Sequence, residues 1–388
     1  MNKKNDVSGM SRKNSIKFSV IRALAALAIA LAVAFILIFV SAEGANFSEK
    51  MSASLKALRE MLVSPLFRKN GTFSVKSFTD VLAQMIPIMF TGLATCIMFS
   101  ANQFNLGAEG GIMLGAFVTA LVAVYWHIPG PMLIVVAIVM GALATGLMML
   151  IPAVLKAKLG VSEMVNSLML NYVIMYMINY LMNTYLADTS KGVTQTQPFQ
   201  ANAIMPQLVS NGSRLSWGFV IAIIMVILCW FFMYRTRWGY GIRMTGINQP
   251  FVMYSGMNVA MIIILCQVLG GILAGMGGGI EMLGRYSVYN WIQQPQYGWT
   301  GITVAILAGN NPIYVPLAAF FMAYLTKGCT LMSTNANVPS QLISIIQAVI
   351  FLFFAAHQFL AGYRQKLVVK SAQEELAQKE AAERSGEK

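Results

Sequence analysis

The chain has 388 residues, of which 57% are apolar and 11% are charged, and its mean hydropathy is +0.65. Soluble proteins carry about 25% charged residues, so this composition excludes an ordinary soluble domain. Apolar stretches of roughly 20 residues, the length that crosses a bilayer as a helix, recur along the chain. The sequence therefore predicts an all-α membrane protein with many spanning helices.

The formal net charge of +13 is distributed in short basic clusters between the apolar stretches. Such clusters act as topology signals, so they indicate no nucleic-acid partner. The cysteines lie within apolar stretches, and the two histidines lie at the ends of such stretches without a partner cluster. The sequence therefore predicts no disulfide, no metal site and no cofactor.

Ten spanning helices are predicted in chain order, with an internal repeat. They cover residues 18–41, 79–100, 108–126, 131–153, 163–187, 215–234, 258–282, 298–310, 313–332 and 340–361. Their even number puts both termini on one side, and the tendency of basic residues to remain inside assigns that side to the cytoplasm. We expect cytoplasmic tails at residues 1–17 and 363–388, on either side of a transmembrane domain of residues 18–362.

Residues 42–78 form the first predicted external loop. Several basic residues in this loop are an exception to the tendency of basic residues to remain on the cytoplasmic side. Within the loop, Leu55, Leu58, Met61 and Leu62 recur at helical spacing. They predict an amphipathic helix lying on the outer membrane surface.

Two polar stretches interrupt the apolar pattern at membrane depth. The first, residues 102–111, contains FNLGAEGG, and the second, residues 298–312, ends in Gly-Asn-Asn-Pro. They occupy matching positions in the two halves of the chain, which is the pattern of a repeat with broken helices, and substrate sites tend to lie at such breaks. The predicted residues of a translocation path are Phe104, Asn105, Glu109, Asn310 and Asn311.

The carboxyl group of Glu109 has two explanations. In a structural role it occupies the first turn of its own helix, where the helix dipole favours an acid, and Asn105 caps the same helix. In a functional role both side chains line the path, since ionisable residues within a membrane commonly mark a site. A second buried acid, Glu281, is expected to pair with Arg285 four residues later.

Four aromatic residues surround the second polar stretch, namely Tyr289, Trp291, Tyr297 and Trp299. Tryptophan and tyrosine often form a belt at the membrane surface. Alternatively, these rings stack on a flat ligand such as a nucleobase.

Residues 235–257 form a predicted cytoplasmic segment with a basic start and a Gly-rich turn at residues 238–241. Asn248-Gln249-Pro250 then predicts the start of a short helix, which Gly256 ends. The segment is either a loop with a basic topology signal or a docking helix for a soluble partner. The chain has no G-x-x-x-x-G-K-[ST] phosphate-binding motif, so the energy for uphill transport would come from another chain or from an ion.

Four motifs together resemble the permeases of ATP-binding-cassette (ABC) importers in the simple-sugar and nucleoside branch. They are FNLGAEGG at residues 104–111, LKAKLGVSEMVNSLMLNYV at 155–173, RTRWGYGIRMTGINQPFVMYSGMNV at 235–259 and GITVAILAGNNP at 301–312. The third resembles the coupling loop of that family, and the matching residues are Gly239, Arg243, Gly246, Asn248, Pro250 and Gly256. This sequence departs from the family's coupling-loop pattern at Met244, Thr245 and Ile247. It departs from the first motif at Gly111.

The resemblance implies a type II ABC importer fold in the bacterial inner membrane, with no enzymatic activity in this chain. It implies a second permease subunit, a cytoplasmic ATPase with two nucleotide-binding cassettes, and an extracellular substrate-binding lipoprotein. It also implies nucleosides as substrates, transported by alternating access, and the extra first helix is similar to that of the larger permease in such systems. The alternatives are a simple-sugar permease, an ion-coupled secondary transporter, and a membrane scaffold that transports nothing.

Overall fold

The structure is a computed structural model that describes residues 32–40, 46–67, 72–188, 192–209 and 212–336, together with positions 338, 345 and 348–349. The chain divides into two compact units, residues 1–58 with 336–388 and residues 59–335. In the first unit, residues 32–40 are helical, within the first predicted span. Most of the tenth predicted span and both predicted tails lie outside the described residues.

The larger unit contains the helices that correspond to predicted spans two to nine. They are α3 (Val75–Ser100), α4 (Ala108–Tyr125), α5 (Met132–Leu159), α6 (Glu163–Leu181), α7 (Gly218–Arg235), α10 (Val259–Arg285), α11 (Tyr297–Leu307) and α12 (Val315–Ala336). The shorter elements are η1 (Met182–Leu186), η3 (Ala201–Ala203), α8 (Arg237–Ile247), α9 (Gln249–Tyr254) and η4 (Pro312–Tyr314). Among the described residues, six helices are long and apolar enough to cross a membrane, and none of the described elements is a β-strand. The all-α class is confirmed, whereas the count of ten and the internal repeat stay predictions.

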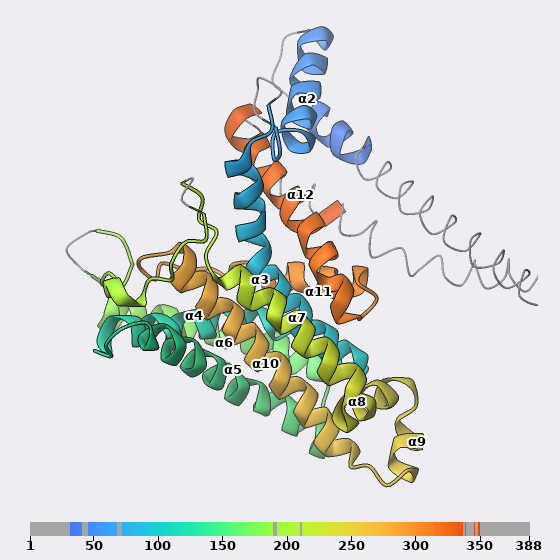
Figure 1. Cartoon of the computed structure of the whole chain (residues 1–388). Helices are drawn as coiled ribbons and strands as arrows, with labels where there is room; N and C mark the ends of the chain where they lie inside the picture. Colours follow the sequence, from blue (N-terminus) through green and yellow to red (C-terminus); the bar gives the residue numbers. More distant parts are fainter. Residues whose placement is uncertain are drawn as a thin grey trace, which may run out of the picture. The chain divides into compact units, whose positions relative to one another are not determined.

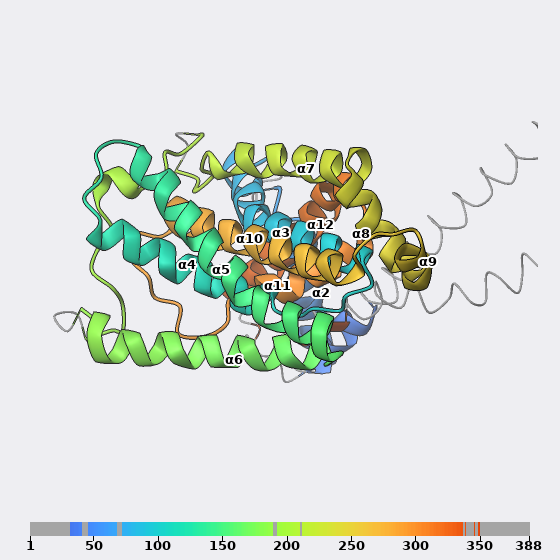
Figure 2. The ribbon, with the colours of Figure 1, turned by 90° about the horizontal axis from the view of Figure 1, so that it is seen from below.

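Helix α10 packs against α3, α4 and α5 at the centre of this unit (Figure 1). In Figure 2, α6 and α7 lie on opposite sides of these central helices, and α8 and α9 lie together at one end.

Glycines allow the close packing of these central helices, as they commonly do between membrane helices. A Cβ on Gly115 of α4 would lie 2.4 Å from the Cα of Gly275 of α10. A Cβ on Gly275 would in turn lie 2.8 Å from the carbonyl oxygen of Gly141 of α5.

Helices α3 and α10 run antiparallel. A Cβ on Gly277 would lie 2.5 Å from Phe90, whereas a Cβ on Gly270 would lie 2.8 Å from the sulfur of Met98. Later residues of α10 therefore pack against earlier residues of α3. The start of α3 and the end of α10 consequently lie at the same end of the unit.

Helix α6 buries polar residues and exposes apolar ones. Its buried side chains include Glu163, Ser167 and Asn171, whereas Met169 is 64% exposed and Tyr176 is 66% exposed. A soluble helix would show the reverse pattern. The arrangement suits a helix with one side in lipid and with its polar groups turned toward the protein.

The amphipathic helix predicted before the second span is confirmed as α2 (Phe47–Leu62). Its last turn belongs to the larger unit, where the side-chain amide of Asn335 donates to Glu60 over 2.9 Å. The hydroxyl of Tyr324 on α12 also donates to the carbonyl oxygen of Leu62. The last turn of α2 is therefore fixed to α12, while its position on the outer membrane surface stays a prediction.

Candidate functional site

The chain between α3 and α4 is a non-helical stretch inside the protein, which we call the first break (residues 101–107). Ala101, Gln103, Asn105 and Gly107 in it are buried. Non-helical backbone at membrane depth must find hydrogen-bond partners within the protein or in a water-filled cavity. The first break therefore depends on polar groups from neighbouring helices.

Helix α6 supplies side-chain partners for the backbone of the first break. The amide of Phe104 donates to Glu163 Oε1 over 3.1 Å, and the amide of Leu106 donates to Ser167 Oγ over 2.9 Å. The other carboxyl oxygen of Glu163 is 2.8 Å from Lys156 Nζ at the end of α5. Glu163 thus links α5, α6 and the first break.

Asn171 extends the same row of side chains one turn further along α6. Its Oδ1 accepts from the amide of Gly110 over 2.9 Å, and its Nδ2 donates to the carbonyl oxygen of Leu106 over 3.0 Å. Residues 163, 167 and 171 are four apart and therefore lie on one face of the helix. We call Glu163, Ser167 and Asn171 the α6 polar row.

Asn105 is fully buried within the first break. Its Oδ1 accepts from the amide of Gly107 over 2.7 Å, and its Nδ2 donates to Gln267 Oε1 of α10 over 2.8 Å. The N-cap residue of α4 is Gly107, and no side chain caps that helix. The prediction that Asn105 caps it is therefore wrong, because its side chain closes a turn two residues ahead and holds the break against α10.

Glu109 lies in the first turn of α4, as predicted, but its carboxyl group binds a different helix. It accepts from the backbone amides at the start of α11, at 2.5 Å from Gln296, 2.6 Å from Gly298 and 3.3 Å from Trp299. Amides in the first turn of a helix have no partner within it, and the helix dipole there favours an acid. Glu109 is fully buried and links α4 to α11.

The second break, residues 308–311, separates α11 from η4 and α12. Gly309 and Asn310 have φ angles of 61° and 56°, so the backbone turns through left-handed conformations. The side chain of Asn311 then accepts from the amide of Ile313 over 3.2 Å. Asn310 and Asn311 are half-buried, and the buried Oδ1 of Asn310 has no hydrogen-bond partner in the described part of the chain.

The second break contacts the last residue of α3, directly before the first break. The hydroxyl of Ser100 donates to the backbone oxygen of Asn310 over 3.4 Å. Phe104 is 49% exposed and packs its ring against Phe99 at 5.0 Å between centroids. Of the predicted path residues, Phe104, Asn310 and Asn311 are thus at least partly accessible, whereas Asn105 and Glu109 are enclosed in this conformation.

The predicted Gly-rich turn at residues 238–241 is wrong, because this stretch lies within helix α8. The hydroxyl of Thr236 accepts from the amide of Gly239 over 3.1 Å and so caps α8. A Cβ on Gly239 would lie 2.2 Å from the carbonyl oxygen of Phe232. Glycine is needed there for a close approach of α8 to the end of α7, and not for a turn.

The short helix predicted after Asn248 is confirmed as α9. Asn248 Oδ1 accepts from the amide of Phe251 over 3.1 Å, Pro250 lies in the first turn, and Gly256 follows the helix with a φ angle of 80°. The outward side chains of α9 are large and apolar. Phe251, Met253 and Tyr254 are 49%, 61% and 85% exposed.

Helix α8 connects α9 to the breaks. A Cβ on Gly246 would lie 2.1 Å from the carbonyl oxygen of Ser100, so α8 rests directly on the last residue of α3. The guanidinium of Arg243 lies 4.6 Å from the ring centre of Tyr234 on α7. Ser100 therefore contacts both α8 and the second break.

The aromatic residues before α11 form a cluster inside the protein. Tyr289 is fully buried, Trp291 is 8% exposed, and their ring centroids are 6.2 Å apart. The prediction of a membrane-surface belt is wrong for these two rings, which pack on each other and on Phe117 and Tyr297. Burial raises the pKa of the Tyr289 hydroxyl.

The predicted ion pair between Glu281 and Arg285 is confirmed, at 3.2 Å. The hydroxyl of Tyr297 in α11 also donates to Glu281 over 3.2 Å. Glu281 therefore fixes the start of α11 to the end of α10.

Comparison with known proteins matches residues 77–355 to the family described as "branched-chain amino acid transport system / permease component". The chain belongs to this family of ABC transporter permeases.

A similar relative, the guanosine ABC transporter permease protein NupP of Bacillus subtilis, is 30% identical over 308 residues, which cover 78% of this chain and 88% of NupP. The glucose permease protein TsgB13 of Haloferax volcanii is 31% identical over 299 residues, covering 74% of this chain and 78% of TsgB13. The nucleoside permease protein NupB of Lactococcus lactis is 29% identical over 300 residues, which cover 74% of this chain and 81% of NupB. No solved structure matches this permease.

The resemblance to the nucleoside and simple-sugar branch is thus confirmed. The permease is a multi-pass membrane subunit of an ABC importer and is not itself an enzyme, since ATP hydrolysis belongs to a separate ATPase. A substrate-binding protein is also general to such systems. Family membership favours ATP-driven import over the ion-coupled transporter and the membrane scaffold.

Sequence reasoning missed the partners of the first break. Glu163, Ser167 and Asn171 were not predicted as a functional group, although polar residues recurring every fourth position in an apolar helix were a usable signal. Gln267 was missed as well, and its place in the middle of apolar α10 was a similar signal. These side chains hold the predicted path residues in place.

Proposed function

We propose that this permease is the larger membrane subunit of an ATP-driven importer of nucleosides. The names of NupP and NupB support nucleosides over simple sugars. The glucose permease TsgB13 supports the alternative, a simple sugar. In this proposal both termini lie in the cytoplasm, a second permease subunit completes the path, and an extracellular lipoprotein delivers the nucleoside.

The observation that carries the mechanism is the contact of three segments at Ser100. Ser100 ends α3, touches Gly246 of α8, and donates to Asn310 of the second break. A displacement of α8 would therefore be transmitted through Ser100 to the first break, which follows it in the chain, and to the second break, to which it donates a hydrogen bond. In the proposed mechanism the ATPase, which carries two nucleotide-binding cassettes, causes that displacement.

Helix α9 is the proposed docking element for the ATPase. It is capped at both ends and presents Phe251, Met253 and Tyr254 outward, and large apolar side chains are typical anchors at protein interfaces. Within the segment, Arg243, Gly246, Asn248, Pro250 and Gly256 are the proposed coupling residues. Arg243 and Gly246 hold α8 against α7 and α3, whereas Asn248, Pro250 and Gly256 set the two ends of α9.

The proposed path runs beside the two breaks. Phe104, Asn310 and Asn311 are available to a solute in this conformation, and Phe104 offers a ring on which a nucleobase can stack. Asn105 and Glu109 are proposed to join the path only when the start of α11 moves away from Glu109. Alternating access would then couple exposure of these polar groups to movement of α11.

The substrate is tested with the complete importer reconstituted in vesicles. Uptake of radiolabelled uridine is measured in competition with adenosine, guanosine, ribose and glucose. We expect the nucleosides to compete and the free sugars not to compete. Competition by glucose or ribose alone would replace the nucleoside assignment with the simple-sugar alternative.

The docking role is tested with Phe251→Ala combined with Tyr254→Ala. We expect uptake to fall at least about tenfold while the ATPase subunit keeps hydrolysing ATP, because an interface anchor contributes about 2 kcal/mol or more. Tyr185→Ala, at a tyrosine that is 69% exposed and lies outside the coupling segment, is the control. Unchanged uptake in the double variant would contradict the docking role of α9.

A further inference from the structure

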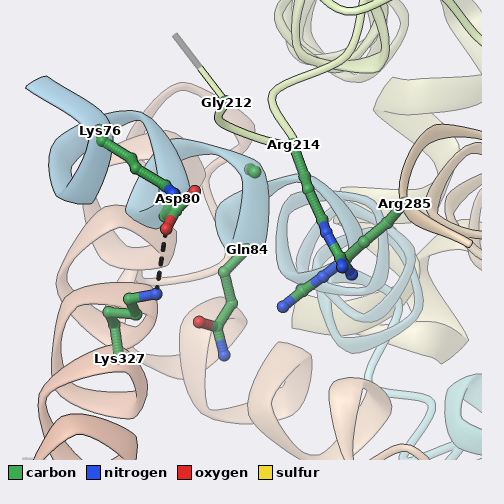
Figure 3. Close-up of a pocket in the computed structure, with 8 residues that line it drawn as sticks. Lys76, Asp80, Gln84, Gly212, Arg214, Arg285 and Lys327 are labelled. Carbon is green, nitrogen blue, oxygen red and sulfur yellow. Dashed lines mark hydrogen bonds and ion pairs between the residues drawn. The ribbon is translucent and has the colours of Figure 1, made fainter.

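The end of the unit opposite the coupling segment contains a cavity of about 360 Å³. Its lining includes Lys76, Asp80, Gln84, Arg214, Arg285 and Lys327 (Figure 3). Four of these six side chains are basic and one is acidic. A concave site with such an excess of positive charge attracts anions.

The basic side chains come from separate elements that meet at one place. Lys76 belongs to the first turn of α3 and Arg285 is the last residue of α10, and these two helix ends lie at the same end of the unit. Lys327 comes from α12 and Arg214 from the loop before α7. That loop lies close to α3, since a Cβ on Gly212 would be 3.8 Å from Lys76 Nζ.

Only part of the positive charge is balanced within the protein. Lys327 pairs with Asp80 at 3.2 Å, and Arg285 pairs with the neighbouring buried Glu281 at 3.2 Å. In the described ranges, neither Lys76 nor Arg214 has an acidic partner within 4.0 Å. Neither of them therefore forms an ion pair at the cavity, although Arg214 is close enough to Glu281 to interact with its charge.

Lys76 lies at a helix end whose dipole disfavours a cation. The first turn of a helix carries the positive end of its dipole, which disfavours a cation, and α3 has no acidic residue in that turn to offset Lys76. A bound anion would interact favourably with the helix end, with Lys76 and with Arg214 at once.

We propose that this cavity binds a phosphate-type oxyanion. Guanidinium groups donate in pairs to phosphate oxygens and ammonium groups add a compact charge, so Arg214 with Lys76 suits a phosphate group. Arg285 keeps further donors besides the one that contacts Glu281, and the amide of Gln84 adds a neutral donor. The cavity also includes the ends of two helices long and apolar enough to cross a membrane, α3 and α10, and such ends commonly meet the headgroup region.

The same phosphate chemistry has two sources, an anionic phospholipid headgroup and a free phosphate. The site does not depend on which solute the permease transports. Both sources are tested with the purified full-length permease in a neutral detergent. For the lipid, phosphatidylglycerol is added, and phosphatidylcholine is the control. For the free anion, inorganic phosphate is added, and chloride at the same ionic strength is the control. Binding is measured by microscale thermophoresis.

The test compares the wild-type permease with Lys76→Gln combined with Arg214→Gln. We expect the wild type to bind at least one of the two phosphate probes, and the double variant to bind it at least about tenfold more weakly, because charge-assisted hydrogen bonds are lost. Lys56→Gln combined with Arg59→Gln removes the same charge from exposed positions on α2 and should bind like the wild type. Arg214→Gln alone, in an exposed loop, should reduce affinity even if the double variant fails to fold.

Binding of phosphatidylglycerol alone would identify a lipid headgroup site, and binding of inorganic phosphate would identify a site for free phosphate. Two results would overturn the proposal. One is a wild type that binds neither probe more tightly than its neutral counterpart. The other is an equal loss of affinity in the α2 control variant, which would reveal general charge attraction and no site.

Discussion

The two breaks differ in how their backbones are satisfied, although both follow a helix and both lie next to Ser100. Each contains an asparagine in a left-handed conformation, Asn102 or Asn310, and both φ angles are 56°. The first break is mostly buried and takes side-chain partners from α6 and α10. The second is half-buried and is closed locally by Asn311.

This difference follows from depth of burial. A backbone amide that reaches water needs no protein partner, whereas a buried one without a partner costs about 1–3 kcal/mol. Residues 101–107 therefore require side chains that lie more than fifty positions away in the sequence, such as Glu163 and Gln267. Substitutions in and around the first break should consequently destabilise the permease far more than substitutions in the second.

The largest effect is expected for Glu109→Ala, because Glu109 connects the first break to the start of α11. Its loss leaves the buried amide of Gly298 and the part-buried amides of Gln296 and Trp299 without their acceptor. We expect a decrease of about 3–5 kcal/mol in the free energy of unfolding. The measurement is equilibrium unfolding of the purified permease in mixed micelles of SDS and a mild detergent.

Glu109→Gln separates the structural role of this residue from a path role. Glutamine keeps one acceptor oxygen and should retain a good part of the stability. If the variant remains folded but loses uptake, Glu109 acts in the path. Stability of Glu109→Ala equal to the wild type would contradict the link between α4 and α11.

A smaller but still large effect is expected for Asn171→Leu in the α6 polar row. The substitution removes the bonds to the carbonyl oxygen of Leu106 in the first break and to the amide of Gly110 in the first turn of α4. We expect unfolding to become easier by about 2–4 kcal/mol in the same assay. Tyr172→Leu, at the next residue and 49% exposed, is the control and should change stability much less.

Ser167→Ala should have an intermediate effect of about 1–2 kcal/mol, since it removes one acceptor from the amide of Leu106. Met169→Ala, on the exposed side of α6, provides a comparison that leaves the first break intact. An equal loss in both variants would show that packing of α6, and not its hydrogen bonds to the break, determines stability.

The smallest effect is expected for Asn310→Gly in the second break. Glycine adopts positive φ angles without steric cost, and the Oδ1 of Asn310 accepts no bond from the described residues. We expect stability to stay within about 0.5 kcal/mol of the wild type or to increase slightly. Loss of uptake at unchanged stability would support a path role for Asn310, and a loss of stability as large as that of Asn171→Leu would remove the contrast between the breaks.

The sequence predicts the parts of the fold that depend on local pattern. Apolar stretches locate the described spanning helices, Asn248 and Gly256 locate the ends of α9, and the spacing of Glu281 and Arg285 identifies their ion pair. Each of these features depends on residues within one or two helical turns.

The errors arise where distant packing decides the structure. Gly239 and Gly241 suggest a turn, but close contact with neighbouring helices explains why small residues stand there within α8. Glu109 is correctly placed in the first turn of its own helix, yet its partners are nearly two hundred positions away. No local pattern reveals which helix end lies opposite a buried acid.

The contact of Gly115, Gly275 and Gly141 constrains how this permease can move. Because the backbones of α4, α10 and α5 approach closely at these glycines, rotation of one of these helices against the others would bring larger side chains into the contact. We therefore expect the three helices to move as one block, with opening to either side of the membrane produced by the surrounding helices. Transport in this permease would thus involve movement of peripheral helices around a rigid central core, and not a loosening of the whole helix bundle.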